Sequence, residues 1–364
     1  MIKSFLQFLS EQNKGSETIP HISTPNTHDS VGTHADFLKD LHNNLLGKDT
    51  KTEFHHHYSG MPIQFGINPK NGKHFVNTPG KSPNFSHREI DNNYSNSPEV
   101  AEKLKTALNE LPKITPTKGG VYHGSLLYTK PDIQTKKDHH EFNSGGTIYS
   151  AHKNSKEGKD VNLSNMGLVI HSQEKNGNIV PLDKKTREKF IDHPDVNNID
   201  PNIKVNPLNY TLPEQKEYHT HMGLAQDVYS KMKPEAFDAI KGHENLMKDH
   251  VDEMHKNNKI PTFNSYVNHL SKTYEDRIND AATPEQKQNR NSRHSEMMKQ
   301  AIENKDHFDK ILKFHHHLKN AATVLKGISD KNHPFALKDS NSIPKVSERI
   351  IGINNKTGEM VQHA

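Results

Sequence analysis

The sequence predicts an α+β protein in which an antiparallel sheet domain carries a helical insertion. Three observations support this class. Residues 52–208 contain short apolar runs between turn residues, residues 212–328 carry apolar side chains at helical spacing, and residues 341–364 return to a strand pattern. Residues 1–51 combine a helix with a flexible linker. Because the strand pattern resumes after the helices, we expect the first and last strands to share one sheet domain.

The composition indicates a modest core and a polar surface. Only 30% of the 364 residues are hydrophobic and 7% are aromatic. The 48 Lys and Arg residues barely exceed the 44 Asp and Glu residues, so the net charge does not indicate a strong general attraction to nucleic acid. The chain has no cysteine, which excludes disulfides and thiolate metal sites. No apolar run approaches the ~20 residues that cross a membrane, so we expect a soluble intracellular protein.

The most informative stretch covers residues 55–78. Apolar residues alternate along its first strand, at Ile63, Phe65 and Ile67, which predicts a half-buried strand. Residues 69–72 read Pro-Lys-Asn-Gly. Because Asn-Gly readily adopts the positive φ angles of a two-residue hairpin loop, we expect a tight hairpin here.

Further elements follow from the same patterns. A helix is expected over residues 98–111, and strands over residues 120–128, 146–150 and 166–171. A last hairpin is expected over residues 347–361, with its turn at Lys-Thr-Gly.

The helical region, residues 212–328, should contain four or five helices in a thin bundle. Prolines at positions 213 and 234 mark two helix starts, because a proline in the first turn loses no hydrogen bond. The last helix is expected within residues 284–325. Its apolar stripe consists of Phe308, Leu312, His315, Leu318, Ala322 and Leu325. An earlier helix, over residues 33–46, is expected to brace the sheet.

The stretch over residues 57–76 resembles the active-site strand of a phage-encoded family with the nucleotidyltransferase fold of RNA ligases. The resemblance rests on the order of a bend ending in Gly60, then Met61-Pro62, Phe65-Gly66, Asn68-Pro69-x-x-Gly72-Lys73 and Phe75-Val76. In that family the bend reads Lys-x-Asp-Gly, and its lysine accepts AMP from ATP. Here His57 and Ser59 stand in place of the lysine and the aspartate.

Two other segments continue the resemblance. Residues 120–126 read Gly-Val-Tyr-His-Gly-Ser-Leu and resemble the family's Gly-Val-Tyr-Gln-Gly-Asp-Leu strand, so Ser125 stands at the position of its acidic residue. In the tail, Glu348 fits a glutamate of the family, and the family's final lysine would fall near Gln362 or His363. The resemblance therefore implies four altered or retained catalytic positions, namely His57, Ser59, Ser125 and Glu348. It also implies nucleotide contacts at Tyr58, Gly60, Lys81 and Tyr149.

These departures favour an inactive member of the family. Transfer of a nucleotide through a covalent intermediate needs an amine nucleophile, an acidic group and cations around the phosphates. We therefore expect a phage protein that has lost catalysis, binds no cofactor, and serves as a virion component or a partner-binding element. Other phage proteins are the expected partners, nucleic acid is the second candidate, and no membrane is expected. The location would be the host cytoplasm or the virion.

The alternative is an active ATP- and Mg²⁺-dependent nucleotidyltransferase or RNA ligase. His57 would be its nucleophile, since histidine also forms phosphoramidates, or a relocated lysine such as Lys81 would replace it. The wealth of Asn, Lys and Ile, and the opening residues Met1 to Phe5, resemble many proteins of tailed phages.

The chain holds 28 histidines, several of them in runs at residues 55–57, 139–140, 219–221 and 315–317. Consecutive residues diverge on both strands and helices, so no run can supply three ligands to one metal. Most histidines are expected in solvent or in polar networks, while a structural metal that joins His123 or His171 to another cluster stays open. A third alternative is a metal-dependent hydrolase built from these histidines, but their spacing in the sequence matches no recognised set of metal ligands.

Overall fold

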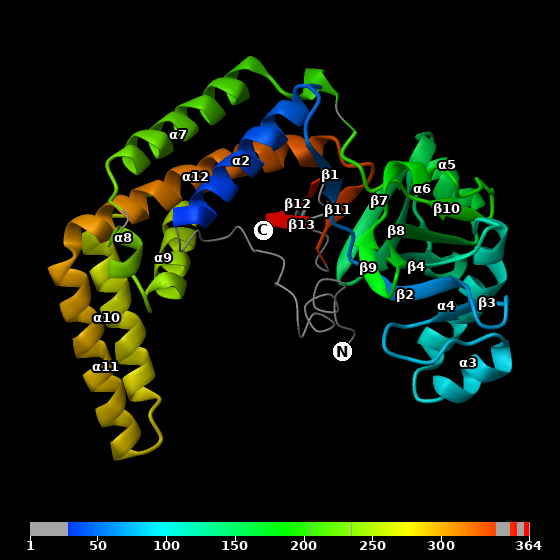
Figure 1. Ribbon diagram of the computed structural model, residues 1–364, viewed down its shortest axis with the longest axis horizontal. Coiled ribbons are helices and arrows are strands. Elements are labelled where there is room, and N and C mark those ends of the chain that lie inside the picture. The colour runs from blue at the N-terminus through cyan, green and yellow to red at the C-terminus, as the bar shows by residue number, and fades with distance from the viewer. Residues whose placement is uncertain (1–27, 205, 234, 340–349, 355–359, 364) are drawn as a thin grey trace. The chain divides into compact units, whose positions relative to one another are not determined.

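The computed structural model describes residues 28–204, 206–233, 235–339, 350–354 and 360–363. The chain is an α+β protein that divides into two compact units (Figure 1). The sheet unit takes its described residues from 51–204 and 329–362, and the helical unit takes its from 21–50 and 205–328. Glu348 lies outside the described residues, as does the turn expected at residues 356–358. Among the described residues, no helix is long and apolar enough to cross a membrane.

The sheet unit contains three sheets among the described residues. The largest has the order β10-β8-β4-β2-β3, and β9 pairs with β8. Its strands are β2 (Met61–Ile67), β3 (His74–Asn77), β4 (Gly120–Thr129), β8 (Met166–Lys175), β9 (Asn178–Pro181) and β10 (Val196–Asn198). β10 runs parallel to β8, and the other pairs are antiparallel. The expected antiparallel pairing is therefore confirmed for every strand pair of this sheet except β8 with β10, because the pattern within a strand does not specify its partner.

The two smaller sheets bring the C-terminal part of the chain back to the sheet unit. A four-stranded sheet has the order β11-β7-β6-β5, and a three-stranded sheet has the order β1-β12-β13. Their strands are β1 (Thr52–His56), β5 (Gln134–Thr135), β6 (His139–Ser144), β7 (Thr147–His152), β11 (Ala336–Lys338), β12 (Ile350–Asn354) and β13 (Met360–His363). Residues 336–338 pair with β7, and residues 350–354 pair with β1.

The β2–β3 hairpin has a longer loop than the sequence predicted. The last cross-strand pair is Ile67 with His74, and the amide of Asn68 donates to the carbonyl of Lys73 over 2.9 Å. Of the Asn-Gly pair, only Gly72 has a positive φ, at 68°. The prediction of a two-residue loop is therefore wrong, because such a loop requires positive φ at both of its residues.

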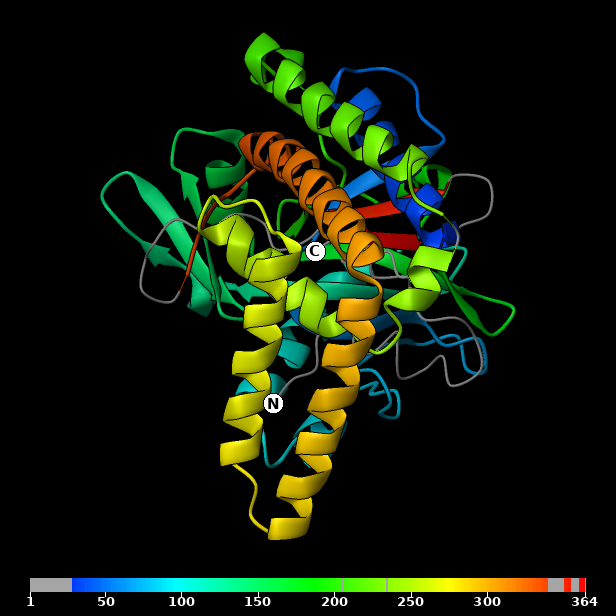
Figure 2. The same cartoon turned by 90° about the vertical axis from the view of Figure 1, so that its left-hand side faces the viewer.

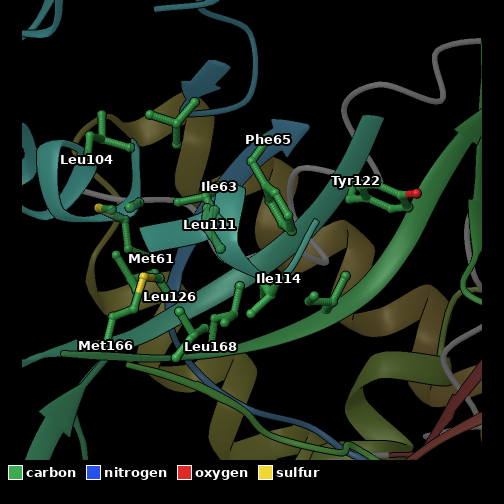
Figure 3. Close-up of a cluster of buried hydrophobic side chains, with 14 of the residues drawn as sticks. Met61, Ile63, Phe65, Leu104, Leu111, Ile114, Tyr122, Leu126, Met166 and Leu168 are labelled. Carbon is green, nitrogen blue, oxygen red and sulfur yellow. The ribbon is translucent and has the colours of Figure 1, made fainter. Parts of the chain in front are cut away.

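One face of the large sheet packs against α4 (Pro98–Glu110) and forms the main core of this unit. Figure 3 shows Leu104 and Leu111 pointing toward side chains of the strands, among them Ile63 and Leu126. Leu104 and Ile63 are fully buried, and each such side chain contributes about 1.5–3 kcal/mol relative to an exposed position. The remaining helices of this unit are α3 (His87–Asn93), α5 (Lys156–Leu163) and α6 (Lys184–Arg187), with 3-10 turns η1 (Leu111–Lys113) and η2 (Lys130–Asp132).

The helical unit consists of seven α-helices in the described part of the chain. They are α2 (His28–Leu45), α7 (Leu212–Ser230), α8 (Glu235–Ala239), α9 (Glu244–Lys256), α10 (Phe263–Asn279), α11 (Pro284–Glu303) and α12 (Lys305–Lys331), and the 3-10 turn η3 (Pro207–Asn209) precedes α7. Figure 2 shows α10 and α11 side by side. The helix expected to brace the sheet is α2, and it belongs to this helical unit instead.

The segment 284–325, expected to hold one helix, is broken at Asn304. The side-chain amide of Asn304 donates to the carbonyl of Gln300 over 2.9 Å and ends α11. α12 then begins at Lys305 and buries the whole predicted stripe from Phe308 to Leu325. Residues 212–328 therefore hold six helices instead of four or five. The start expected at residue 234 leads only into the short α8, and α9 follows as a separate helix. The break at Asn304 carries no strong sequence signal.

Candidate functional site

A cavity of about 520 Å³ lies within the sheet unit. It is formed by the bend between β1 and β2, one face of α4, the middle of β4, the η2–β5 segment and the β6–β7 turn. Its lining residues are His57, Tyr58, Ser59, Gly60, Met61, Glu99, Val100, Lys103, Ser125, Leu126, Asp132, Gln134, Asn143, Ser144 and Gly145. The bend and the Ser125 position, which lie far apart in the sequence, therefore share one cavity.

Two glycines allow the walls of this cavity to approach each other. A Cβ atom on Gly60 would lie 2.9 Å from the carbonyl oxygen of Leu126 and equally close to Leu127. Gly145 has φ of +58°, and a Cβ atom there would lie 2.7 Å from the Cβ of Ser59. Real Cβ atoms are not found at such distances from other heavy atoms. Glycine at position 60 is therefore required by the packing of the bend against β4.

Tyr149 supports the bend from outside the cavity. Its hydroxyl accepts a hydrogen bond from the backbone amide of Ser59 over 2.9 Å. Its ring stacks on the ring of Tyr58, with centroids 6.1 Å apart. The resemblance implied a nucleotide contact for Tyr149, but Tyr149 is not among the lining residues, and its contacts position the bend.

Tyr58 is a lining residue of the cavity, and its hydroxyl is buried. The side chain is 5% exposed, and its Oη has no hydrogen-bond partner among the described residues. Burial, and then the neighbouring Tyr149, raise the pKa of Tyr58 well above its usual value. Tyr58 therefore stays a neutral donor, and an unpaired buried donor is costly unless a ligand or water satisfies it.

Lys103 is the cationic lysine of the cavity, and sequence reasoning missed it. Its Nζ lies 3.3 Å from Asp132 Oδ1 and 3.4 Å from Glu99 Oε1, and its side chain is 19% exposed. Asp132 is held in turn, since its carboxylate accepts from the backbone amide of Thr129 over 2.7 Å. The only signal for Lys103 was its position on the expected helix 98–111, one turn after Glu99.

Lys81 lies elsewhere in the sheet unit. It is exposed, its amide donates to the carbonyl of Thr78, and its carbonyl accepts from the side chain of Asn77. It does not line the cavity. The expected nucleotide contact at Lys81 therefore stays a prediction, and this cavity gives it no support.

The charges of the cavity are few and nearly balanced. Two carboxylates, Glu99 and Asp132, face one ammonium, Lys103, and the other polar lining groups are uncharged or belong to His57. Ser59, Ser125, Asn143, Ser144 and Gln134 supply hydroxyl and amide groups. Such a lining can bind an uncharged polar molecule through hydrogen bonds, and it offers no excess of positive charge to a chain of phosphates.

His123 and His171 were left open as ligands of a structural metal. Nε2 of His123 lies 3.2 Å from Glu174 Oε1, and Nδ1 of His171 lies 2.6 Å from Ser172 Oγ. Burial is the main cause that lowers the pKa of each. In the part of the chain that the structure describes, the one group of three close metal-ligand side chains contains neither of them.

Residues 26–337 match the model of a protein family described as a family of unknown function, DUF6267. No curated protein and no solved structure matches the chain.

Proposed function

The chain belongs to the DUF6267 family, and we propose that it is a catalytically inactive phage protein of nucleotidyltransferase-like fold that binds a ligand or partner group without covalent chemistry. One observation carries the proposal. The cavity gathers His57, Ser59 and Ser125 at the altered motif positions, and its single described lysine, Lys103, is held by two carboxylates.

Catalysis would need groups that this cavity does not offer. An adenylyl-accepting amine must reach the α-phosphate, and cations must stabilise the charge that leaves with pyrophosphate. Lys103 is engaged with Glu99 and Asp132, so its nitrogen is not presented to a phosphate. Ser59 and Ser125 cannot orient a metal ion as carboxylates do. The supporting groups have therefore changed together with the nucleophile.

Binding is the function that the remaining groups support. The serine, asparagine and glutamine side chains of the lining offer neutral donors and acceptors. Met61, Val100 and Leu126 supply apolar contacts. A nucleoside, which combines a flat apolar face with several polar atoms, fits this chemistry better than a triphosphate.

Binding measurements on the intact protein test this proposal. Calorimetry with adenosine and with ATP, each with and without Mg²⁺, should show adenosine bound at least as tightly as ATP and no gain from Mg²⁺. Asn143→Trp should fill the cavity from an exposed lining position and weaken adenosine binding by tenfold or more. Asn162→Trp, at an exposed position of α5 outside the cavity, is the matched control.

Two outcomes would contradict the proposal. ATP that binds more than tenfold tighter than adenosine in the presence of Mg²⁺ would indicate a working phosphate site. A covalent AMP adduct that disappears in His57→Ala would favour the active alternative, since His57 lines the cavity at the place of the family's lysine.

A further inference from the structure

The helical unit contains a cluster of metal-ligand side chains that is separate from the cavity of the sheet unit. His250 and Glu253 lie three residues apart on α9, and His269 lies on α10. One ligand atom from each of these residues lies within 4.8 Å of the other two. Because residues three apart share a face of a helix, α9 presents both of its ligands toward α10. The two helices pack against each other.

One nitrogen of His250 is held by Ser265, since Nε2 of His250 lies 2.9 Å from the hydroxyl oxygen of Ser265. That oxygen also lies 2.9 Å from the carbonyl oxygen of Thr262, so Ser265 can donate to this carbonyl while it accepts from His250. In that arrangement the proton of His250 is on Nε2, and its Nδ1 carries a lone pair.

That lone pair is buried and unsatisfied. His250 is 2% exposed, and its Nδ1 has no hydrogen-bond partner among the described residues. Burial first, and then the neighbouring His269, lower the pKa of His250 to about 4, so the imidazole stays neutral at ordinary pH. A neutral imidazole whose other N–H is held by a neighbouring group is the usual state of a histidine metal ligand.

The other two ligands already lie in contact. Nδ1 of His269 lies 3.1 Å from Glu253 Oε2, which is within hydrogen-bond distance. The ring centroids of His250 and His269 are 5.1 Å apart. A divalent cation that replaced the proton would meet two imidazoles and one carboxylate. Glu253 is exposed, so the remaining coordination position would face solvent.

We propose that His250, Glu253 and His269 bind one zinc-class divalent transition-metal ion, which ties α9 to α10 and leaves one coordination position to water. Two imidazoles and one carboxylate suit Zn²⁺ and Co²⁺, whereas Mg²⁺ and Ca²⁺ require sites built from oxygen ligands. The sequence signal is the His-x-x-Glu spacing on α9, which was hidden among the many other histidines.

Metal titration of the full chain, stripped first with a chelator, tests the site. Zn²⁺ calorimetry should reveal one tight site per chain above a weaker background from the other histidines. Co²⁺ should give the intense visible absorption of a four-coordinate site, and Mg²⁺ and Ca²⁺ should not compete. His269→Ala and Glu253→Gln should each weaken the tight site by tenfold or more, and Ser265→Ala should weaken it by roughly 10–100-fold through lost orientation of His250.

His152→Ala is the matched control, because it removes one exposed histidine from the sheet unit. It should leave both the tight Zn²⁺ site and the Co²⁺ spectrum unchanged. Circular dichroism confirms that each variant keeps its helices. An unaltered tight site in folded His269→Ala, or an equal loss in His152→Ala, would overturn the proposal, as would the absence of any site tighter than the background.

Discussion

At the scale of single residues, the cavity depends on close contacts at two glycines, which any larger side chain would disrupt. Gly60 lies against the backbone of β4, and Gly145 lies against Ser59. Ser59 is also tied to Tyr149 through its backbone amide. The bend is therefore held by its packing on both sides, which keeps His57, Ser59 and Ser125 together even though none of them is a charged catalytic group.

Gly60→Ala is expected to lower the free energy of unfolding of the sheet unit by about 1–3 kcal/mol, the usual cost of an overpacked position. The added methyl group would lie 2.9 Å from a backbone oxygen, which cannot move without shifting β4. Urea unfolding measures the change. Gly327→Ala in α12, where a Cβ atom meets nothing within 4 Å, is the control and should be neutral or stabilising.

The sheet unit is expected to lose stability as the pH falls below 6.5. Burial lowers the pKa of His333 from 6.5 to about 4, and the ring of His333 lies against His56, whose pKa is also lowered by burial. The unfolded chain therefore binds protons in this range that the folded chain does not. For His333 alone, the free energy of unfolding should fall by about 3 kcal/mol between pH 6.5 and pH 4.

Urea unfolding at a series of pH values measures this dependence. His333→Phe removes the titrating group and should flatten the slope between pH 6.5 and 4, whatever its effect on stability at pH 7. His152→Ala, at an exposed position, should leave the slope unchanged. A slope that stays the same in His333→Phe would assign the acid sensitivity to other groups.

Only some of the residues that line the cavity could be predicted from the sequence. The resemblance drew attention to His57 through Gly60 and to Ser125, which the structure brings into one cavity. It could not indicate Lys103, because an ion pair between α4 and η2 depends on tertiary packing. It also could not separate Tyr58, which lines the cavity, from Tyr149, which lies behind it.

At the scale of elements, strong local patterns were predicted well and pairings were not. The strands expected over residues 120–128 and 166–171 lie within β4 and β8, and the stripe from Phe308 to Leu325 is buried in α12. The short helices α3 and α5 were missed, since each buries only one or two residues. The pairings of β1 with β12 and of β8 with β10 link distant segments, which periodicity cannot specify.

Ile350→Ala tests the return of the chain to β1. Ile350 pairs with His56 at the end of β12 and is 2% exposed. Its truncation should lower the free energy of unfolding by about 2–5 kcal/mol, as for other buried isoleucines. Ile351→Ala, at the adjacent and only partly buried position, is the matched control and should cost clearly less. Equal effects of the two substitutions would argue against this packing.

At the scale of the whole molecule, the two units are interleaved along the sequence, since each takes residues from separate stretches. Cutting the chain at one point therefore removes part of both units. We proposed a partner-binding role, and the helical unit offers exposed apolar side chains beside polar helices. Leu208, in η3, is 88% exposed, and Leu212, the first residue of α7, is 79% exposed. For the partner-binding role proposed above, these two leucines, four positions apart in the sequence, are the contacts to test.

Leu208→Lys with Leu212→Lys should reduce the amount of this protein that copurifies with assembled phage particles by about tenfold, if these leucines act as binding hot spots. The reason is that a charged side chain cannot enter an apolar contact without loss of hydration. Leu163→Lys, at a leucine 65% exposed on α5, is the control and should copurify as the unaltered protein does. Quantitative mass spectrometry of purified particles provides the measurement. Full retention of the double variant would exclude Leu208 and Leu212 as the partner contact.

We proposed that this cavity binds its ligand without forming a covalent nucleotide adduct. Intact-protein mass spectrometry after incubation with ATP and Mg²⁺ or Mn²⁺ tests this proposal. The unaltered protein should keep its mass and should show no label from radioactive ATP on a denaturing gel. His57→Lys combined with Ser59→Asp should remain nearly inert, because catalytic groups that act as a unit are strongly non-additive and Ser125 is still not acidic. An acid-labile AMP adduct on the unaltered protein that is lost in His57→Ala, and kept in His152→Ala, would contradict the claim.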